Sequence, residues 1–181
     1  MFKSGFKNGA ILILGGAKSG KSTLALRLFD GPGLEHIFIA TAEALDAEMK
    51  DRIKRHQVER GEKWTTVEEP LDIVARITEL DRDDMVILID CLTLWLNNLF
   101  MRHAHNHEEI YRQIDELAVE LSNLKGIVIL VSNEIGMGIV PENKLARDFR
   151  DAAEYMNQRI AAVAGKAVIV FAGMPVILKD E

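Results

Sequence analysis

The segment Gly15-Gly16-Ala17-Lys18-Ser19-Gly20-Lys21-Ser22 decides the fold class, because it matches the full phosphate-binding loop pattern GxxxxGK[ST]. It follows an apolar run at residues 10–14 that is typical of a buried strand, and we expect a helix to begin near Ser22. In this order of strand, loop and helix, glycines let backbone N–H groups surround phosphate oxygens at a helix N-terminus. The segment therefore predicts binding of a nucleoside triphosphate.

Two side chains are expected to complete this phosphate site. Lys21 should reach the outer phosphates, and Ser22 should hold Mg²⁺. Asp90 ends an apolar strand at residues 86–89, where its carboxylate would emerge at the carboxyl edge of a sheet and bind Mg²⁺ through water. The alternatives are an ordinary glycine-rich turn and a solvated aspartate. A chance match to the loop pattern is expected in roughly 1% of such chains, so we favour the nucleotide site.

The remaining pattern predicts an α/β fold with a mostly parallel sheet. Apolar runs at residues 10–14, 37–40, 86–89, 127–131 and 167–171 are nearly continuous, as in strands covered on both faces by helices. Apolar residues spaced three and four apart predict helices at residues 46–60, 106–124 and 145–163. Residues 176–179 follow a Gly173-Met174-Pro175 turn, which predicts a closing antiparallel hairpin. We expect one P-loop NTPase domain of RecA-like type at residues 10–181, after a flexible extension at residues 1–9.

Composition limits the possible partners and location. The chain has 181 residues, is 48% apolar and carries a formal net charge of −6, which argues against general binding to nucleic acid or anionic membranes. No apolar stretch approaches the length of a membrane span. Cys91 is the single cysteine, so no intrachain disulfide can form. A reducing compartment, most simply the cytoplasm, is expected.

His56 stands out because it shares the apolar register of Leu45, Met49 and Ile53 in the helix expected at residues 46–60. A histidine on this inward face is either a hydrogen-bonded core residue or a nucleophile. A neutral imidazole can attack phosphorus and form a phosphoramidate. The residues alone leave both interpretations open and favour the core residue.

His103, His105 and His107 alternate in a polar stretch and suggest a metal site. No cysteine lies near them in the sequence, and the stretch links two expected helices. We therefore favour a solvent-exposed loop over a zinc site.

Further segments follow the loop in a fixed order. They are Ile39-Ala40-Thr41-Ala42, Asp90-Cys91-Leu92-Thr93, VSNEIGMGIVPEN at residues 131–143, Ala146-Arg147-Asp148-Phe149-Arg150-Asp151 and Asn157-Gln158-Arg159. Together with the loop, this combination resembles the family of bifunctional adenosylcobinamide kinases and adenosylcobinamide-phosphate guanylyltransferases of cobalamin synthesis. The resemblance covers nearly all of residues 10–179.

The resemblance implies two reactions. A phosphoryl group passes from ATP or GTP to the aminopropanol hydroxyl of adenosylcobinamide, and GMP then passes from GTP to the new phosphate, giving adenosylcobinamide-GDP and pyrophosphate. The family forms a guanylyl-histidine, and the matching position is His56, which reverses the preference for a core residue. Implied catalytic residues are His56 and Lys21. Implied nucleotide contacts are Gly15, Gly16, Ala17, Lys18, Ser19, Gly20, Lys21, Ser22, Ala40, Thr41, Ala42, Gln57, Val58, Glu59, Arg60, Glu68 and Asp90, with Ser22 and Asp90 on Mg²⁺.

The resemblance also implies a homotrimer, with the apolar helix at residues 92–101 as a possible interface. Two features depart from the family pattern. Arg55 precedes His56 where some relatives carry a second histidine, and residues 101–108 match no family segment. Two other functions stay open: a plain P-loop small-molecule kinase, and a nucleotide-switched ATPase or binding protein.

Overall fold

The computed structural model describes residues 8–29, 33–43, 61, 63–103 and 106–180, which form one seven-stranded sheet in the order β3-β2-β4-β5-β1-β6-β7. All neighbouring strands are parallel except β7, which pairs antiparallel with β6. The strands are β1 (Gly9–Gly15), β2 (Glu35–Ala40), β3 (Thr65–Glu68), β4 (Met85–Asp90), β5 (Ile127–Val131), β6 (Lys166–Phe171) and β7 (Met174–Asp180). The predicted α/β class with a closing hairpin is confirmed.

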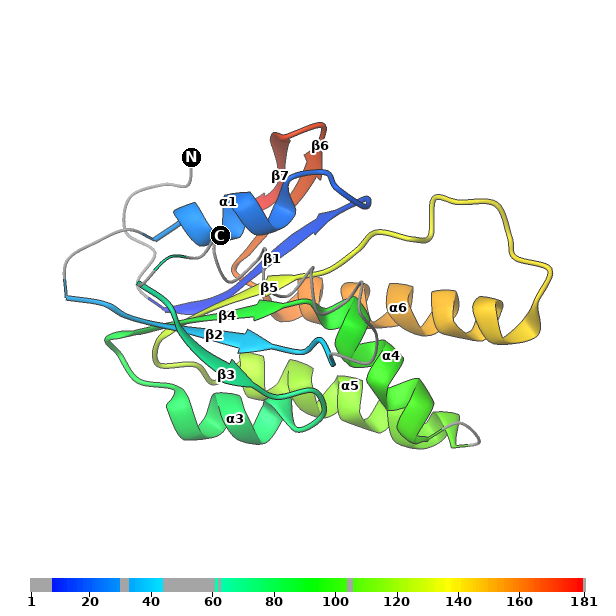
Figure 1. The fold of residues 1–181 in the computed structure, drawn as a ribbon, viewed down its shortest axis with the longest axis horizontal. Coiled ribbons are helices and arrows are strands. Elements are labelled where there is room, and N and C mark those ends of the chain that lie inside the picture. Colours follow the sequence, from blue (N-terminus) through cyan, green and yellow to red (C-terminus); the bar gives the residue numbers. More distant parts are fainter. Residues whose placement is uncertain (1–7, 30–32, 44–60, 62, 104–105, 181) are drawn as a thin grey trace.

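The described helices lie on both faces of the sheet, with α1 on one face and α3, α4, α5 and α6 on the other (Figure 1). Their bounds are α1 (Lys21–Arg27), α3 (Ile73–Leu80), α4 (Leu92–Arg102), α5 (His107–Leu121) and α6 (Lys144–Val163). No helix in the described part of the chain combines the length and the apolar character needed to cross a bilayer.

The continuous apolar strands arise because both faces of the sheet are covered. In β1, Ile11 and Ile13 pack with Ala25 of α1, whereas Leu12 faces the cluster that includes Ile160 of α6. Every residue of β5 is buried. Burial on both sides removes the alternation of polar and apolar residues that an exposed sheet would show.

Several predicted boundaries need correction. The short strand β3 and the helix α3 were not predicted, because three of the four β3 residues are exposed and its sequence, TTVE, lacks an apolar run. In the hairpin, Met174 and Pro175 belong to β7, and the turn consists of Ala172 and Gly173, whose φ angles are 49° and 80°. Two central residues with positive φ are the geometry that a two-residue hairpin loop requires.

The long helix α6 begins at Lys144, so Pro141 is not its first residue as an ordinary connector would suggest. Asn143 caps it by accepting hydrogen bonds from the backbone N–H groups of Leu145 and Ala146. The helix α4 packs most of its apolar side chains within this chain, so its apolar character gives no support to the predicted trimer interface. The helix predicted at residues 46–60 lies outside the described residues.

Gly126 stands where the turns before β4 and β5 meet. The Asp81 carboxylate accepts hydrogen bonds from the N–H groups of Lys125 and Gly126, both at 2.8 Å. A Cβ at Gly126 would lie 2.3 Å from the carbonyl oxygen of Arg82 and 2.7 Å from that of Met85. Neither backbone atom can move without disturbing the sheet.

We expect Gly126→Ala to lower the free energy of unfolding by about 1–3 kcal/mol, as measured by urea denaturation. Gly138→Ala is the matched control, because its Cβ would find its nearest neighbour, the Ile135 carbonyl oxygen, at 3.7 Å. The control should change stability by less than about 0.5 kcal/mol. Equal stability of both variants would contradict the steric argument.

Candidate functional site

The predicted phosphate loop joins β1 to α1 at the carboxyl edge of the sheet, and its backbone needs glycine at two positions. Gly15 has a φ of 151°, and a Cβ there would lie 2.6 Å from the Val170 carbonyl oxygen and 2.7 Å from Ser19 Oγ. Gly20 precedes α1 with a φ of 100°. The loop therefore folds back tightly between β1, β6 and α1, as a phosphate cradle must.

The polar groups of this loop are arranged for an anion. Lys21 is buried, and its Nζ donates to the Gly16 carbonyl oxygen across the loop at 2.7 Å. Ser19 Oγ is a buried hydroxyl with no hydrogen-bond partner among the described residues. Gly16, Ala17 and Lys18 are exposed. A buried ammonium and an unsatisfied hydroxyl beside an exposed backbone loop fit the oxygens of a bound phosphate.

The β6–β7 turn braces the cradle from behind. The N–H of Gly173 donates to the Ser19 carbonyl oxygen at 2.8 Å. A Cβ at Gly20 would lie 3.3 Å from Gly173 Cα, so the two backbones are in close contact. The C-terminal hairpin therefore supports the phosphate loop directly.

Three predicted contacts form one row across neighbouring strands. Asp90 of β4 is paired with Ala40 of β2, and Ala40 is paired with Glu68 of β3. All three are the last residues of their strands. Ligands of open parallel sheets bind beyond these carboxyl ends, so the row continues the edge that carries the phosphate loop.

Thr41 lies just beyond this row, and its side chain is committed to the protein. Thr41 is fully buried, and its Oγ1 accepts from the N–H of Cys91 and donates to the carbonyl oxygen of Cys91, both at 2.9 Å. Asn98 of α4 donates to the Thr41 carbonyl oxygen at 2.8 Å. Thr41 thus ties the ends of β2 and β4 together, while Ala42, which follows it, is partly exposed.

Cys91 is an unreactive thiol in this setting. Burial, and then the charge of Asp90, raises the pKa of Cys91 to about 11. At neutral pH the group stays protonated, so it gives no nucleophile beside the phosphate loop.

Two groups of predicted residues fall outside the described part of the chain. They are His56, the proposed nucleophile, and Gln57, Val58, Glu59 and Arg60. Their roles stay predictions from the sequence.

The histidines of the stretch at residues 103–107 have structural contacts. His103 is hydrogen-bonded through Nε2 to Gln113 at 3.3 Å, and the His107 ring packs against Phe100 with a centroid distance of 5.5 Å. The described residues contain no group of three or more potential metal ligands, and His105 lies outside them. These contacts support the non-metal interpretation of the stretch.

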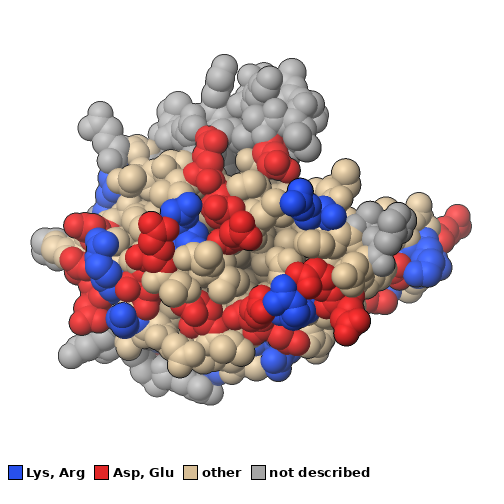
Figure 2. Space-filling view, turned by 90° about the horizontal axis from the view of Figure 1, so that it is seen from below, with Lys and Arg blue, Asp and Glu red and all other residues tan. Residues whose placement is uncertain are grey.

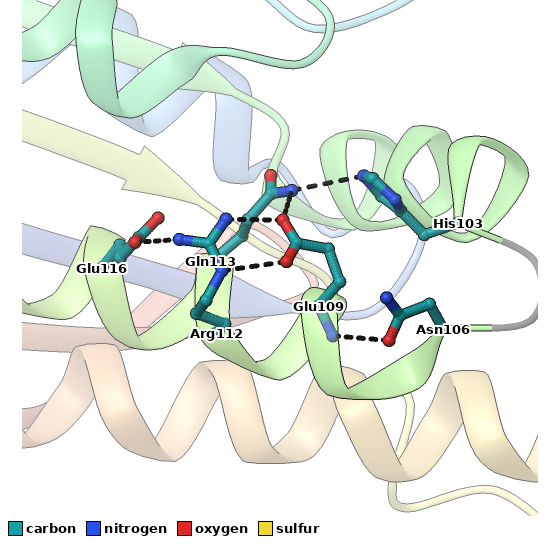
Figure 3. A network of polar contacts seen from close by, with 6 residues as sticks. All are labelled: His103, Asn106, Glu109, Arg112, Gln113 and Glu116. Atoms are coloured by element: carbon teal, nitrogen blue, oxygen red, sulfur yellow. Dashed lines mark hydrogen bonds and ion pairs between the residues drawn. The ribbon is translucent and has the colours of Figure 1, made fainter.

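Figure 3 shows how this region forms the start of α5. The Asn106 side chain caps the helix by accepting from the N–H of Glu109, while Arg112 binds Glu109 and Glu116. Hydrogen bonds from Arg112, first of several causes, lower the pKa of Glu109 to about 2. The network organises a helix N-terminus and lies apart from the phosphate loop in the sequence and the fold.

The end of β5 was not predicted to carry site residues, yet it enters the site between β1 and β4. Ser132 Oγ donates to Asn157 Oδ1 of α6 at 2.7 Å. Glu154, one turn earlier on α6, accepts from the N–H of Gly136 at 2.9 Å. The family-like segments at residues 131–143 and 157–159 signalled this region, but only the fold joins them.

Glu134 and Glu154 both accept from the N–H of Gly136, so the two carboxyl groups lie close together. Burial, and then the neighbouring Glu134 carboxylate, raises the pKa of Glu154 above its usual range. A Cβ at Gly136 would lie 2.7 Å from Glu154 Cδ, so only glycine fits against this helix. The loop after β5 is therefore held firmly on α6.

Solved structures share this fold at low sequence identity. One is a prototypical ATPase of the type III secretion system of pathogenic bacteria, with a TM-score of 0.56, 11% identity, and coverage of 89% of this chain and 50% of that chain. Another is a separate ATPase domain, with a TM-score of 0.52, 12% identity, and coverage of 96% of this chain and 78% of that chain. At these identities the comparison establishes the P-loop NTPase fold alone.

Curated relatives are much more similar in sequence. The bifunctional adenosylcobalamin biosynthesis protein CobP of Pseudomonas aeruginosa is 42% identical, over 94% of this chain and 97% of the relative. The protein CobU of Salmonella typhimurium is 40% identical, over 93% and 99%, and CobU of Escherichia coli is 37% identical, also over 93% and 99%. The family model described as cobinamide kinase / cobinamide phosphate guanyltransferase matches residues 11–178, and the chain belongs to this family.

Proposed function

We propose that this protein phosphorylates adenosylcobinamide with ATP or GTP and then transfers GMP from GTP to the new phosphate. The observation that carries the proposal is the phosphate cradle, with Lys21 across it, set in a chain that belongs to the cobinamide kinase and guanyltransferase family. The products are adenosylcobinamide-phosphate, then adenosylcobinamide-GDP and pyrophosphate. Both reactions attack a phosphorus atom of a nucleotide held by one loop.

In the phosphoryl step, the acceptor hydroxyl oxygen bonds to the γ-phosphorus and the bond from this phosphorus to the β-phosphate oxygen breaks. Lys21 and the backbone N–H groups of residues 15–22 offset the charge on the transferred group and the leaving diphosphate. Catalysis in this step rests mainly on position and charge.

Ser22, at the start of α1, and Asp90, at the end of β4, supply oxygen atoms suited to Mg²⁺. They fit a mode of binding in which the triphosphate and water provide the other oxygens. When bound, the ion would neutralise charge on the β- and γ-phosphates. Its presence is part of this proposal.

In the guanylyl step, His56 attacks the α-phosphorus, pyrophosphate leaves, and a phosphoramidate forms on the imidazole. An oxygen of adenosylcobinamide-phosphate then attacks the same phosphorus, and the bond to His56 breaks. The residues that line the guanine would be Ala40, Ala42 and Glu68 at the strand ends. Gln57 to Arg60 are proposed contacts from the sequence alone.

Location and other partners form a coarser part of the proposal. The single cysteine and the biosynthetic relatives support a cytoplasmic enzyme. Figure 2 shows acidic and basic side chains interspersed on the face that carries α3 and α5. Arg76, Arg82 and Arg112 there are each paired with carboxylates. This mixture, with a net charge of −6, supports the absence of a nucleic-acid partner.

His56→Ala tests the guanylyl step. The parent protein, incubated with Mg²⁺ and GTP labelled at the α-phosphate, should acquire a covalent label that is labile in acid and stable in base. His56→Ala should acquire none, because no other group is proposed to attack the α-phosphorus. His103→Ala is the control and should keep the label.

Absence of label on folded parent protein that binds GTP would leave the simple kinase or the nucleotide-switched ATPase. Formation of adenosylcobinamide-phosphate separates these two, because only the kinase needs the corrinoid.

Lys21→Met tests the phosphoryl step. The substitution keeps the length of the side chain and removes its charge, so kcat for adenosylcobinamide phosphorylation should fall by about 100-fold or more. Lys144→Met, which removes an exposed lysine at the start of α6, should leave kcat unchanged. A Lys21→Met enzyme with parental kcat would remove Lys21 from the mechanism.

A homotrimer is also proposed, and the exposed apolar residues of β7 offer a better surface for it than α4. Met174 and Val176 are 65% and 48% exposed, and they lie on one face of the strand. Light scattering should give a mass of about three chains for the parent. Val176→Glu should lower this mass, whereas Val119→Glu on α5 should not, and an unchanged trimer in Val176→Glu would place the interface elsewhere.

A further inference from the structure

The chain stays extended beyond the end of β5 and reaches the phosphate loop. The N–H of Ser132 donates to the Ile13 carbonyl oxygen at 3.0 Å, and the N–H of Glu134 donates to the Gly15 carbonyl oxygen at 3.1 Å. These bonds continue the parallel ladder in which Ile13 is paired with Val131. Asn133 therefore lies beside Gly15, the first residue of the cradle.

Alternation along this segment decides which face of the sheet Asn133 occupies. Val131 packs in the cluster that contains Ala25 of α1. Ser132 and Glu134 turn to the other face, where they meet Asn157 and Glu154 of α6. Since successive side chains of an extended chain point to opposite faces, the Asn133 side chain lies on the face of α1 and the phosphate loop.

Asp90 shares this face. It is paired with Val131 across β4 and β5, and residues directly opposite each other in a sheet point the same way. Asn133 is two residues beyond Val131, so it is the diagonal neighbour of Asp90, at a distance of about 7–8 Å between Cα atoms. The side chain thus stands between the cradle and the proposed Mg²⁺ ligand.

The backbone of Asn133 is fixed while its side chain is left available. Its N–H donates to Thr93 Oγ1 of α4 at 2.9 Å, and its carbonyl oxygen accepts from Asn157 Nδ2 of α6 at 3.2 Å. Within the described part of the chain, the side-chain amide makes no hydrogen bond, and the residue is partly exposed. A polar group held this firmly without a protein partner is suited to a ligand.

We propose that Asn133 is a nucleotide-contacting residue whose side-chain amide donates a hydrogen bond to the terminal phosphate of the bound nucleoside triphosphate. Thr93 and Asn157 act as positioning residues, because they hold the backbone of Asn133 without reaching the ligand. The inference rests on the proposed function only in taking a nucleoside triphosphate as the ligand of the loop.

This contact would let the site distinguish a triphosphate from a diphosphate. The γ-phosphate carries the anionic oxygens that the amide would bind, and a diphosphate lacks them. Hydrogen bonds to charged groups are stronger than neutral ones, so loss of this bond should weaken triphosphate binding by about 10-fold or more.

The test is calorimetric titration of the whole chain with GTP and with GDP, in the presence of Mg²⁺. Asn133→Ala should raise the Kd for GTP by about 10-fold or more and change the Kd for GDP by less than about 3-fold. Asn123→Ala is the matched control, since Asn123 is an exposed asparagine near the opposite end of β5. It should change neither constant.

Thr93→Val tests the positioning role, because it replaces the hydroxyl that holds the N–H of Asn133 with a methyl group of similar size. It should weaken GTP binding in the same direction as Asn133→Ala and add little when combined with it. A structural role alone would instead weaken GTP and GDP equally.

Equal loss for both nucleotides in Asn133→Ala, or loss for neither, would overturn the assignment. The outcome is separate from the fate of the proposed function. A parent protein that fails to phosphorylate adenosylcobinamide, but shows an Asn133-dependent preference for GTP over GDP, would reject the reaction and keep the phosphate contact.

Discussion

The parallel register of β1, β5 and β4 is the constraint on which the site depends. Ile13, Val131 and Asp90 stand at one level, so the chain leaves the three strands at neighbouring points of one edge. Helices bury the strands from both faces, and a shift of one residue would turn apolar side chains away from their cores. The hydrophobic cores therefore fix the distance between the phosphate loop and Asp90.

Side chains that do not touch the nucleotide set the shape of this edge. Thr41 joins the ends of β2 and β4, and Gly173 braces Ser19 from the hairpin. Glu154 and Asn157 hold the segment after β5 on α6. Because the cradle binds through backbone N–H groups, such supports are what keep its geometry ready for a phosphate.

The same edge separates two kinds of chemistry. The raised pKa of Cys91 keeps the single thiol protonated beside Asp90, so the described residues offer charge and hydrogen bonds to the phosphates without a competing thiolate. The group proposed to form a covalent bond, His56, must approach the α-phosphorus from a segment beyond the described residues. One loop can then hold the nucleotide while different groups attack its α- and γ-phosphates.

The sequence by itself determined the phosphate loop, the strands β1, β2, β4, β5 and β6 and the family, because these are written as local patterns and continuous apolar runs. It did not reveal β3, whose exposed TTVE sequence becomes a strand only by pairing with β2. It also left Asn133 and Glu154 without roles. Only the tertiary structure decided those, because strand order and alternation bring residues 132–136, Thr93 and α6 to the phosphate loop across long separations in sequence.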